Sequence, residues 1–312
     1  MRKYLIITII VISLLLTACS SSEKEFSDDD FVIFTSIYPI QYIVENIAGD
    51  VAMVESIYPP GVDAHTYEPT SKEITKMANA DAFIYLGAGM ESFVETAADA
   101  LTSQDITFVE IGKHEELFME ADHDHTHDHG NHHEHDEHHH FDPHVWFDPL
   151  RMIEMGKIIT EDLSELNPEL QETFTQNFAT FEANMKEIDQ KYVDTLADKH
   201  HPSIIVSHAA YGYWEERYGI EQIPVSGLTS SEEPSQKDLV AVTKMAKEQQ
   251  LKYVIFEQNS SNKTAKIIQE HIHADALEIH NLEMLTASDI ENKEDYLSLM
   301  EKNLEVLRKA TE

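Results

Sequence analysis

The sequence has a single cysteine, Cys19, and few basic residues for its 312-residue length. One cysteine excludes an internal disulfide framework. The chain carries 22 Lys and Arg residues against 58 Asp and Glu residues, so its formal net charge at pH 7 is −36. Such a chain repels nucleic acid and anionic membrane surfaces, and its field attracts cations. An acidic surface that only keeps an exported protein soluble explains the charge equally well.

The zinc-hydrolase motif His-Glu-x-x-His is also absent. Its nearest approaches, at His114 and His133, lack the second histidine. A zinc hydrolase also needs an open coordination position for an activated water, and a metal held entirely by protein ligands would leave none. The sequence therefore argues against an enzyme.

A long apolar run occurs only near the N-terminus. Two basic residues precede the run Tyr4–Leu16, and Thr-Ala-Cys19 follows it. This pattern predicts a signal peptide over residues 1–18, cut before Cys19, and then a polar tether over 19–30. The Leu-x-Ala-Cys end resembles a bacterial lipobox, which implies a lipidated Cys19. We expect an extracytoplasmic protein anchored to the bacterial cell membrane; the alternative is a plain secretory signal.

After the tether, short runs rich in Val, Ile, Phe and Tyr alternate with longer segments of helical spacing. This alternation predicts βαβ units and an α/β fold with mostly parallel sheets. The expected strands are Phe31–Ile37, Val51–Ile57, Ala82–Leu86, Ile106–Ile111, Ser203–His208, Gln222–Val225, Tyr253–Glu257 and Ala276–His280. The expected helices among them are Ile40–Ala48, Ser71–Ala80, Met90–Leu101, Tyr211–Tyr218, Ser235–Gln249, Asn262–His271 and Tyr296–Lys309.

Two further helices are expected in the middle of the chain. Asp148 and the proline after it predict a helix start, and that helix ends near Leu166. From Glu169 to Leu196, apolar residues recur in steps of three and four, which predicts one amphipathic helix of ~45 Å. We interpret it as a rigid spine rather than as half of a coiled-coil dimer. The predicted parts are an N-terminal lobe over 31–166, a linking helix over 167–199 and a C-terminal lobe over 200–312.

Residues 121–140 interrupt this pattern with a tract of His, Asp, Glu, Asn and Gly. The tract has no large apolar residue, so it cannot form a core. Its imidazoles can bind zinc, copper or nickel. The candidate auxiliary ligands are His123, His125, His127, His129, His132, His133, His135, His138, His139 and His140.

Four positions after predicted strands or beside the tract are candidate metal ligands, because open parallel sheets bind ligands beyond the carboxyl ends of their strands. Three are His65, His144 and His208. The fourth is acidic, either Glu283 or Glu257. Three imidazoles and a carboxylate would suit four-coordinate zinc. No local motif links these positions, and a histidine at a strand end often serves as a hydrogen-bonding residue.

Three segments carry a family resemblance: Gly61-x-x-x-His-x-Tyr-Glu-Pro69, Asp142-Pro-His-Val-Trp-Phe-Asp-Pro149 and Ser207-His-x-Ala-Tyr-Gly-Tyr213. In this order they resemble the zinc and manganese solute-binding lipoproteins of bacterial ABC transporters, over essentially the whole mature chain. The resemblance implies two α/β lobes joined by one long helix, with metal in the cleft between the lobes.

The resemblance also implies the ligands and the metal. The family's ligand positions fall on His65, His144 and His208. Its carboxylate position falls on Glu283, because Leu-Glu-x-Leu-Thr resembles the matching segment of Gram-positive zinc members; Glu257 is the reserve. Manganese members use two histidines and two carboxylates, whereas zinc members use three histidines and often carry a His-rich loop. The expected transported ligand is therefore Zn²⁺, which imidazole favours over manganese.

The expected function is capture of Zn²⁺ by a monomer and its delivery to an ABC permease and its ATPase. The alternatives are a manganese-binding importer component and a surface adhesin or zinc buffer. The His-rich loop is interpreted as a metal collector, with a sensor of zinc excess and a tolerated insertion as its alternatives. A long helix between the lobes predicts only a small lobe displacement when metal binds.

Overall fold

A computed structural model describes residues 30–120, 141–228, 235–258 and 263–312. The compact unit of the chain that contains the sheets runs from Phe31 to Glu312. Within the described ranges, no helix is both long and apolar enough to cross a membrane. The signal peptide, Cys19 and the ten histidines of the tract lie outside the described residues, so the predictions made for them stay predictions.

The first half of the unit forms a parallel sheet of four strands in the order β2-β1-β3-β4. The strands are β1 (Val32–Thr35), β2 (Met53–Ser56), β3 (Ala82–Tyr85) and β4 (Thr107–Glu110). The helices that connect them are α2 (Tyr38–Ala48), α3 (Ser71–Met77) and α4 (Val94–Leu101). After β1 the chain forms β2 on one side of it and then β3 on its other side, so a topological switch point lies between β1 and β3. Ligands bind at the carboxyl ends of the strands at such a point.

The second half repeats this topology in a parallel sheet of order β10-β9-β7-β8. Its strands are β7 (Ser203–Val206), β8 (Glu221–Pro224), β9 (Tyr253–Glu257) and β10 (Asp275–Ile279). Its helices include α7 (Gly212–Tyr218), α8 (Gln236–Glu248), α9 (Lys263–Ile272), α10 (Ala287–Asn292) and α11 (Tyr296–Thr311). Here the switch point lies between β7 and β9. A buried apolar cluster that includes Ile205, Val242 and Val254 packs the sheet against α8 and α9.

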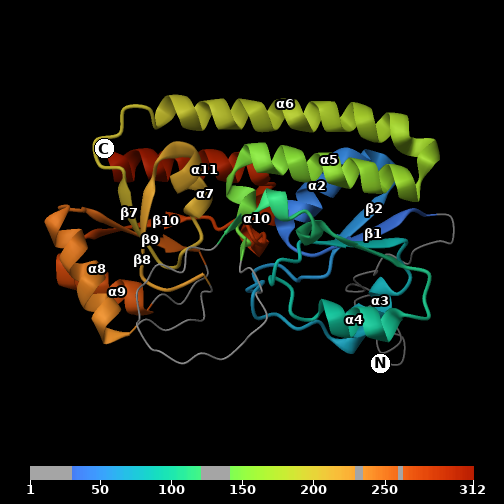
Figure 1. Ribbon diagram of the computed structural model, residues 1–312, viewed down its shortest axis with the longest axis horizontal. Helices are drawn as coiled ribbons and strands as arrows, with labels where there is room; N and C mark the ends of the chain where they lie inside the picture. The colour runs from blue at the N-terminus through green and yellow to red at the C-terminus, as the bar shows by residue number, and fades with distance from the viewer. Residues whose placement is uncertain (1–29, 121–140, 229–234, 259–262) are drawn as a thin grey trace, which may run out of the picture. The chain divides into compact units, whose positions relative to one another are not determined.

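Two long helices lie between the halves in sequence, α5 (Pro149–Leu166) and α6 (Gln171–Thr195). The Asp148 side chain caps α5 by accepting a hydrogen bond from Leu150 N at 2.8 Å. The two helices approach closely at Gly156, where an added Cβ would lie 2.8 Å from the Phe181 ring. Figure 1 shows α6 running past the elements of both sheets. With 25 residues, α6 is about 37 Å long, shorter than expected because residues 168–170 form a 3-10 turn.

The two ends of α6 contact different halves of the unit. Near its start, the Asn177 amide donates to the Ile47 carbonyl of α2 at 2.9 Å. Near its end, the Tyr192 hydroxyl donates to the Met300 carbonyl of α11 at 2.7 Å. Helix α6 therefore braces the first sheet's helices against those of the second. The α/β class with parallel sheets and one long helix is confirmed, while the exact lobe boundaries stay predictions.

Most predicted elements occur within one to three residues of their expected positions, and three details differ. Helix α4 begins at Val94 rather than at Met90, because the turn after β3, with positive φ at residues 87–89, extends to Glu91, whose carboxylate accepts the Leu86 and Gly87 N–H groups. Helix α10 was not predicted from the sequence. Also missed was a short antiparallel pair, β5 (Met119–Glu120) with β6 (Phe141–Asp142), between which residues 121–140 lie in sequence.

Candidate metal site

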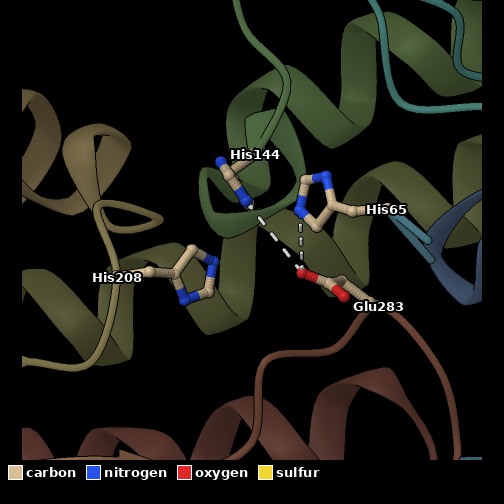
Figure 2. A group of neighbouring side chains, drawn as sticks. All are labelled: His65, His144, His208 and Glu283. Carbon is tan, nitrogen blue, oxygen red and sulfur yellow. Dashed lines mark ion pairs between the residues drawn. The ribbon is translucent and has the colours of Figure 1, made fainter. Parts of the chain in front are cut away.

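Four side chains converge on one point (Figure 2), and three of them follow strands of the two parallel sheets. His65 lies between β2 and α3, His144 precedes η4 (Val145–Phe147), His208 follows β7, and Glu283 lies between β10 and α10. One ligand atom from each residue lies within 4.8 Å of the other three. Glu283 Oε1 is 3.7 Å from His65 Nε2 and 4.0 Å from His144 Nε2. The group thus joins residues that are 64 or more positions apart in sequence.

The four facing atoms are buried polar atoms without a hydrogen-bond partner. They are Nε2 of His65, His144 and His208, together with Oε1 of Glu283. The His65 side chain is 7% exposed, and the other three residues are 3% exposed or less. Buried polar atoms are almost always paired, because an unpaired one loses its hydration without compensation. Four such atoms facing one point are typical of a site that is completed by a cation.

His144 is oriented by the carboxylate two residues before it. Asp142 Oδ1 accepts the His144 backbone N–H at 3.0 Å and lies 2.7 Å from His144 Nδ1. A carboxylate can only accept, so Nδ1 carries the proton and Nε2 presents its lone pair to the cluster. The backbone carbonyl of Asp142 accepts a hydrogen bond from the Tyr213 hydroxyl at 2.7 Å, which fixes the position of Asp142.

His208 is oriented in the same way, from the neighbouring strand. Its Nδ1 lies 2.6 Å from Oε1 of Glu257, the last residue of β9, and the Ser207 hydroxyl also donates to that oxygen. Glu257 is therefore behind His208 rather than among the four facing atoms. The structure does not bring this reserve candidate into the cluster.

The loop that carries His65 is fixed by backbone contacts. Asp63 Oδ1 accepts the His65 N–H at 3.0 Å, and the Tyr58 hydroxyl donates to the Ala64 carbonyl at 3.3 Å. The Gly61 N–H donates across to the Leu285 carbonyl at 3.0 Å, two residues beyond Glu283. The loops that hold two of the four side chains are thus hydrogen-bonded to each other.

Aromatic side chains pack against the segment that carries His144. The Trp146 ring lies 5.2 Å from the His144 ring, and its Nε1 donates to the Asn281 carbonyl at 2.9 Å. The Phe147 ring packs at 4.7 Å from Trp214 and 4.9 Å from Tyr211. These buried rings fix the backbone that follows His144.

The electrostatics of the cluster match a cation site. Burial raises the pKa of the Glu283 carboxyl to about 8, against the attraction of His208. Burial also lowers the pKa of His65 to about 4, and repulsion from the other two imidazoles acts in the same direction. For His208, burial lowers the pKa, but the Glu257 carboxylate outweighs burial and raises it overall. A divalent cation would stabilise the ionised Glu283 and the neutral imidazoles together.

The geometry and the atoms suit zinc. Ligands at 2.0–2.2 Å around a tetrahedral ion are about 3.4 Å apart, so a small inward shift from the observed spacing is sufficient. Three nitrogens and one oxygen form a borderline set that favours zinc over the harder manganese ion. Four protein atoms also fill a tetrahedral shell, which leaves no open position for reactive water.

Two supporting residues, Asp142 and Ser207, were not predicted from the sequence. Asp142 stands in the Asp-Pro-His motif, and a carboxylate two residues before a ligand histidine is a usable signal. Ser207 gave no signal in the sequence, because its contact with Glu257 depends on the pairing of β7 with β9.

Comparisons with known proteins agree with this geometry. The family model described as "ZnuA: Zinc-uptake complex component A periplasmic" matches residues 33–310. The zinc-binding protein AdcA of Streptococcus pyogenes is 33% identical over 320 residues, which covers 100% of this chain and 62% of the relative. The chain thus spans less than two thirds of the AdcA length. The high-affinity zinc uptake system protein ZnuA of Bacillus subtilis is 30% identical over 299 residues, 95% of this chain and 93% of the relative.

A solved structure extends the likeness to three dimensions. The Zn(II)-bound ZnuA-like domain of Streptococcus pneumoniae AdcA superimposes with a TM-score of 0.73 at 30% identity. The superposition covers 90% of this chain and 99% of that domain. A fold with two parallel sheets and one long helix is therefore shared with a protein whose structure contains zinc.

Proposed function

Since the chain belongs to the ZnuA family of zinc-uptake components, we propose that it captures Zn²⁺ outside the cytoplasm and delivers it to an ABC-type importer. The observation that carries the proposal is the set of four unpaired buried atoms on His65, His144, His208 and Glu283. In this account Zn²⁺ is the cargo, and it is released to a permease that an ATPase drives.

Capture begins with a field that concentrates cations around the strongly acidic chain. The ion then binds three Nε2 lone pairs and Glu283 Oε1, and the proton held by Glu283 leaves. Asp142 and Glu257 keep the two imidazoles that they contact in the tautomer that points Nε2 at the ion. The chain's own residues thus bind and hold the cargo; they do not transform it.

The lipid anchor and the loop belong to the same proposal. A lipidated Cys19 would keep the protein near its permease. The His-rich residues 121–140 would collect scarce metal, because the strand that follows them, β6, contains Asp142, which orients His144. A Cys19→Ala variant should be released into the medium, whereas the unaltered chain should fractionate with membranes.

Complementation of zinc uptake tests the transport function. A bacterial strain that lacks this protein should recover growth in chelator-treated medium when it receives the full chain, and it should not recover with His144→Ala. His271→Ala is the matched control, because this exposed histidine of α9 lies outside the cluster. Full recovery with His144→Ala would contradict the proposal.

A further inference from the structure

A histidine outside the cluster, His280, is buried directly after β10, three residues before Glu283. Its backbone is locked to α11 by a two-way contact with Asn303. The His280 N–H donates to Asn303 Oδ1 at 2.9 Å, and Asn303 Nδ2 donates to the His280 carbonyl at 2.8 Å. The position of this ring is therefore set by the helix behind the sheet, independently of the metal cluster.

The His280 ring connects two parts of the loop that carries Glu283. Its Nδ1 accepts the Leu282 N–H at 2.9 Å, so Nδ1 is unprotonated and Nε2 carries the hydrogen. Nε2 in turn donates to Asp289 Oδ2 at 3.1 Å. Asp289 is the third residue of α10 and closes the helix cap by accepting the Thr286 N–H at 2.8 Å. One neutral imidazole thus ties the start of the loop to its end.

The contact with Leu282 fixes an unusual backbone conformation. Leu282 has φ of +64° although it is not glycine, and it is wholly buried. Left-handed conformations of such residues are unfavourable and persist only when their surroundings impose them. The backbone of the next residue, Glu283, is held at both of its polar groups. Its N–H donates to Asn281 Oδ1 at 3.2 Å, and its carbonyl accepts the Tyr38 N–H at 2.8 Å. The turn at Leu282 therefore decides where the Glu283 carboxylate points.

We propose that His280 is a positioning residue that determines metal specificity, by holding Leu282 in its left-handed turn so that Glu283 presents Oε1 alone to the three imidazoles. The inference rests on the proposed function, because it assigns His280 a role at the same metal site. Two consecutive backbone N–H groups, of Leu282 and Glu283, are held by the side chains two residues before them. Only the His280 contact acts on the left-handed residue itself.

Specificity follows from the coordination that each ion accepts. Zinc is satisfied by four ligands at tetrahedral spacing, whereas manganese prefers six, mostly oxygen. A loop that fixes Glu283 allows this carboxylate to supply one oxygen and suits zinc. A loosened loop would let the carboxylate turn and supply both oxygens, which weakens the preference for zinc.

The test compares His280→Leu with His280→Asn in the full chain. Leucine has a side chain of similar volume but cannot accept the Leu282 N–H. Asparagine can accept it, since an Asn side chain readily bonds the backbone N–H two residues on. The control is Val242→Ala in the cluster beneath α8, which lowers stability away from the loop. Zinc and manganese affinities are measured by chelator competition through the change in tryptophan fluorescence, to which Trp146 contributes because its ring packs on His144. The visible spectrum of bound Co²⁺ reports four-coordinate geometry.

The expected result for His280→Leu is a loss of zinc affinity of about 10- to 100-fold. Its Co²⁺ spectrum should lose the intensity of a four-coordinate ion, and its manganese affinity should not fall in parallel. His280→Asn should retain the zinc affinity and the spectrum. If His280→Leu instead retains the wild-type zinc-to-manganese ratio and Co²⁺ spectrum, as Val242→Ala should, the positioning role is wrong. Failure of the unaltered chain to bind zinc at the cluster would instead refute the proposed function.

Discussion

The affinity of the cluster for zinc should rise steeply with pH, because Glu283 must ionise before it can bind the ion. Its carboxyl has an ordinary pKa of 4.5, which burial raises to about 8. A group with a pKa of about 8 is about 1% ionised at pH 6 and about half ionised at pH 8. This difference alone predicts an affinity about 50-fold higher at pH 8 than at pH 6. His208, whose pKa is also raised, acts in the same direction.

Chelator competition at pH 6, 7 and 8 measures this slope, and Glu283→Gln is the matched variant. The glutamine oxygen needs no deprotonation, so the variant should bind zinc more weakly with a flatter pH profile. Calorimetry in buffers of different ionisation enthalpy should show proton release on zinc binding to the unaltered chain at pH 7. The reasoning is refuted if the unaltered affinity changes by less than about threefold between pH 6 and 8, or if Glu283→Gln has the same slope.

Three further predictions concern stability, orientation and motion. The folded-state pKa of Glu283 lies above its unfolded value, so the metal-free protein should lose stability as pH rises from about 4.5 to 8. The rise in Tm that zinc causes should therefore be larger at pH 8 than at pH 6. Equal rises at the two pH values would contradict this prediction. Glu257→Gln should lower zinc affinity by up to about 10-fold, since a neutral amide accepts the Nδ1 hydrogen of His208 more weakly than a carboxylate does. Exposed Glu248→Gln should leave the affinity unchanged, and titration of both variants decides this. Finally, the radius of gyration should hardly change on zinc binding, because α6 contacts both α2 and α11. A large contraction measured by small-angle scattering would contradict this.

The sequence predicted the fold well because its strands and helices carry strong local signals. Short runs rich in β-branched and aromatic residues lie in both sheets, and Asp148 with Pro149 marks the start of α5. Two of the three histidines follow predicted strands, whose carboxyl ends parallel sheets bring together, and His144 adjoins the His-rich tract. The family resemblance implied all three as ligands. Their mutual distances depend on the packing of two sheets, which no local pattern contains.

The preference for Glu283 over Glu257 came from the family resemblance of its segment, because the strand positions of the two residues do not separate them. Both residues end or follow neighbouring strands of the same sheet. The structure separates them, because Glu257 accepts hydrogen bonds from His208 and Ser207, while Glu283 Oε1 faces the three imidazoles without a hydrogen-bond partner. Two-residue strands such as β5 and β6 are too short to show a period, so that pair was missed. Three consecutive positive φ angles after β3 likewise shortened α4 without a helix-breaking proline.

The most direct test of the account is the metal content of a chain in which Asn-Gly replaces residues 121–140. Glu120 pairs with Phe141 across the antiparallel strands, so a two-residue turn closes the pair in register. The shortened chain should retain one tightly bound zinc that outcompetes manganese, and His208→Ala in the same background should lose it. A shortened chain without a tight zinc site would mean that the His-rich residues are the binder, and the four-residue cluster would no longer explain zinc capture.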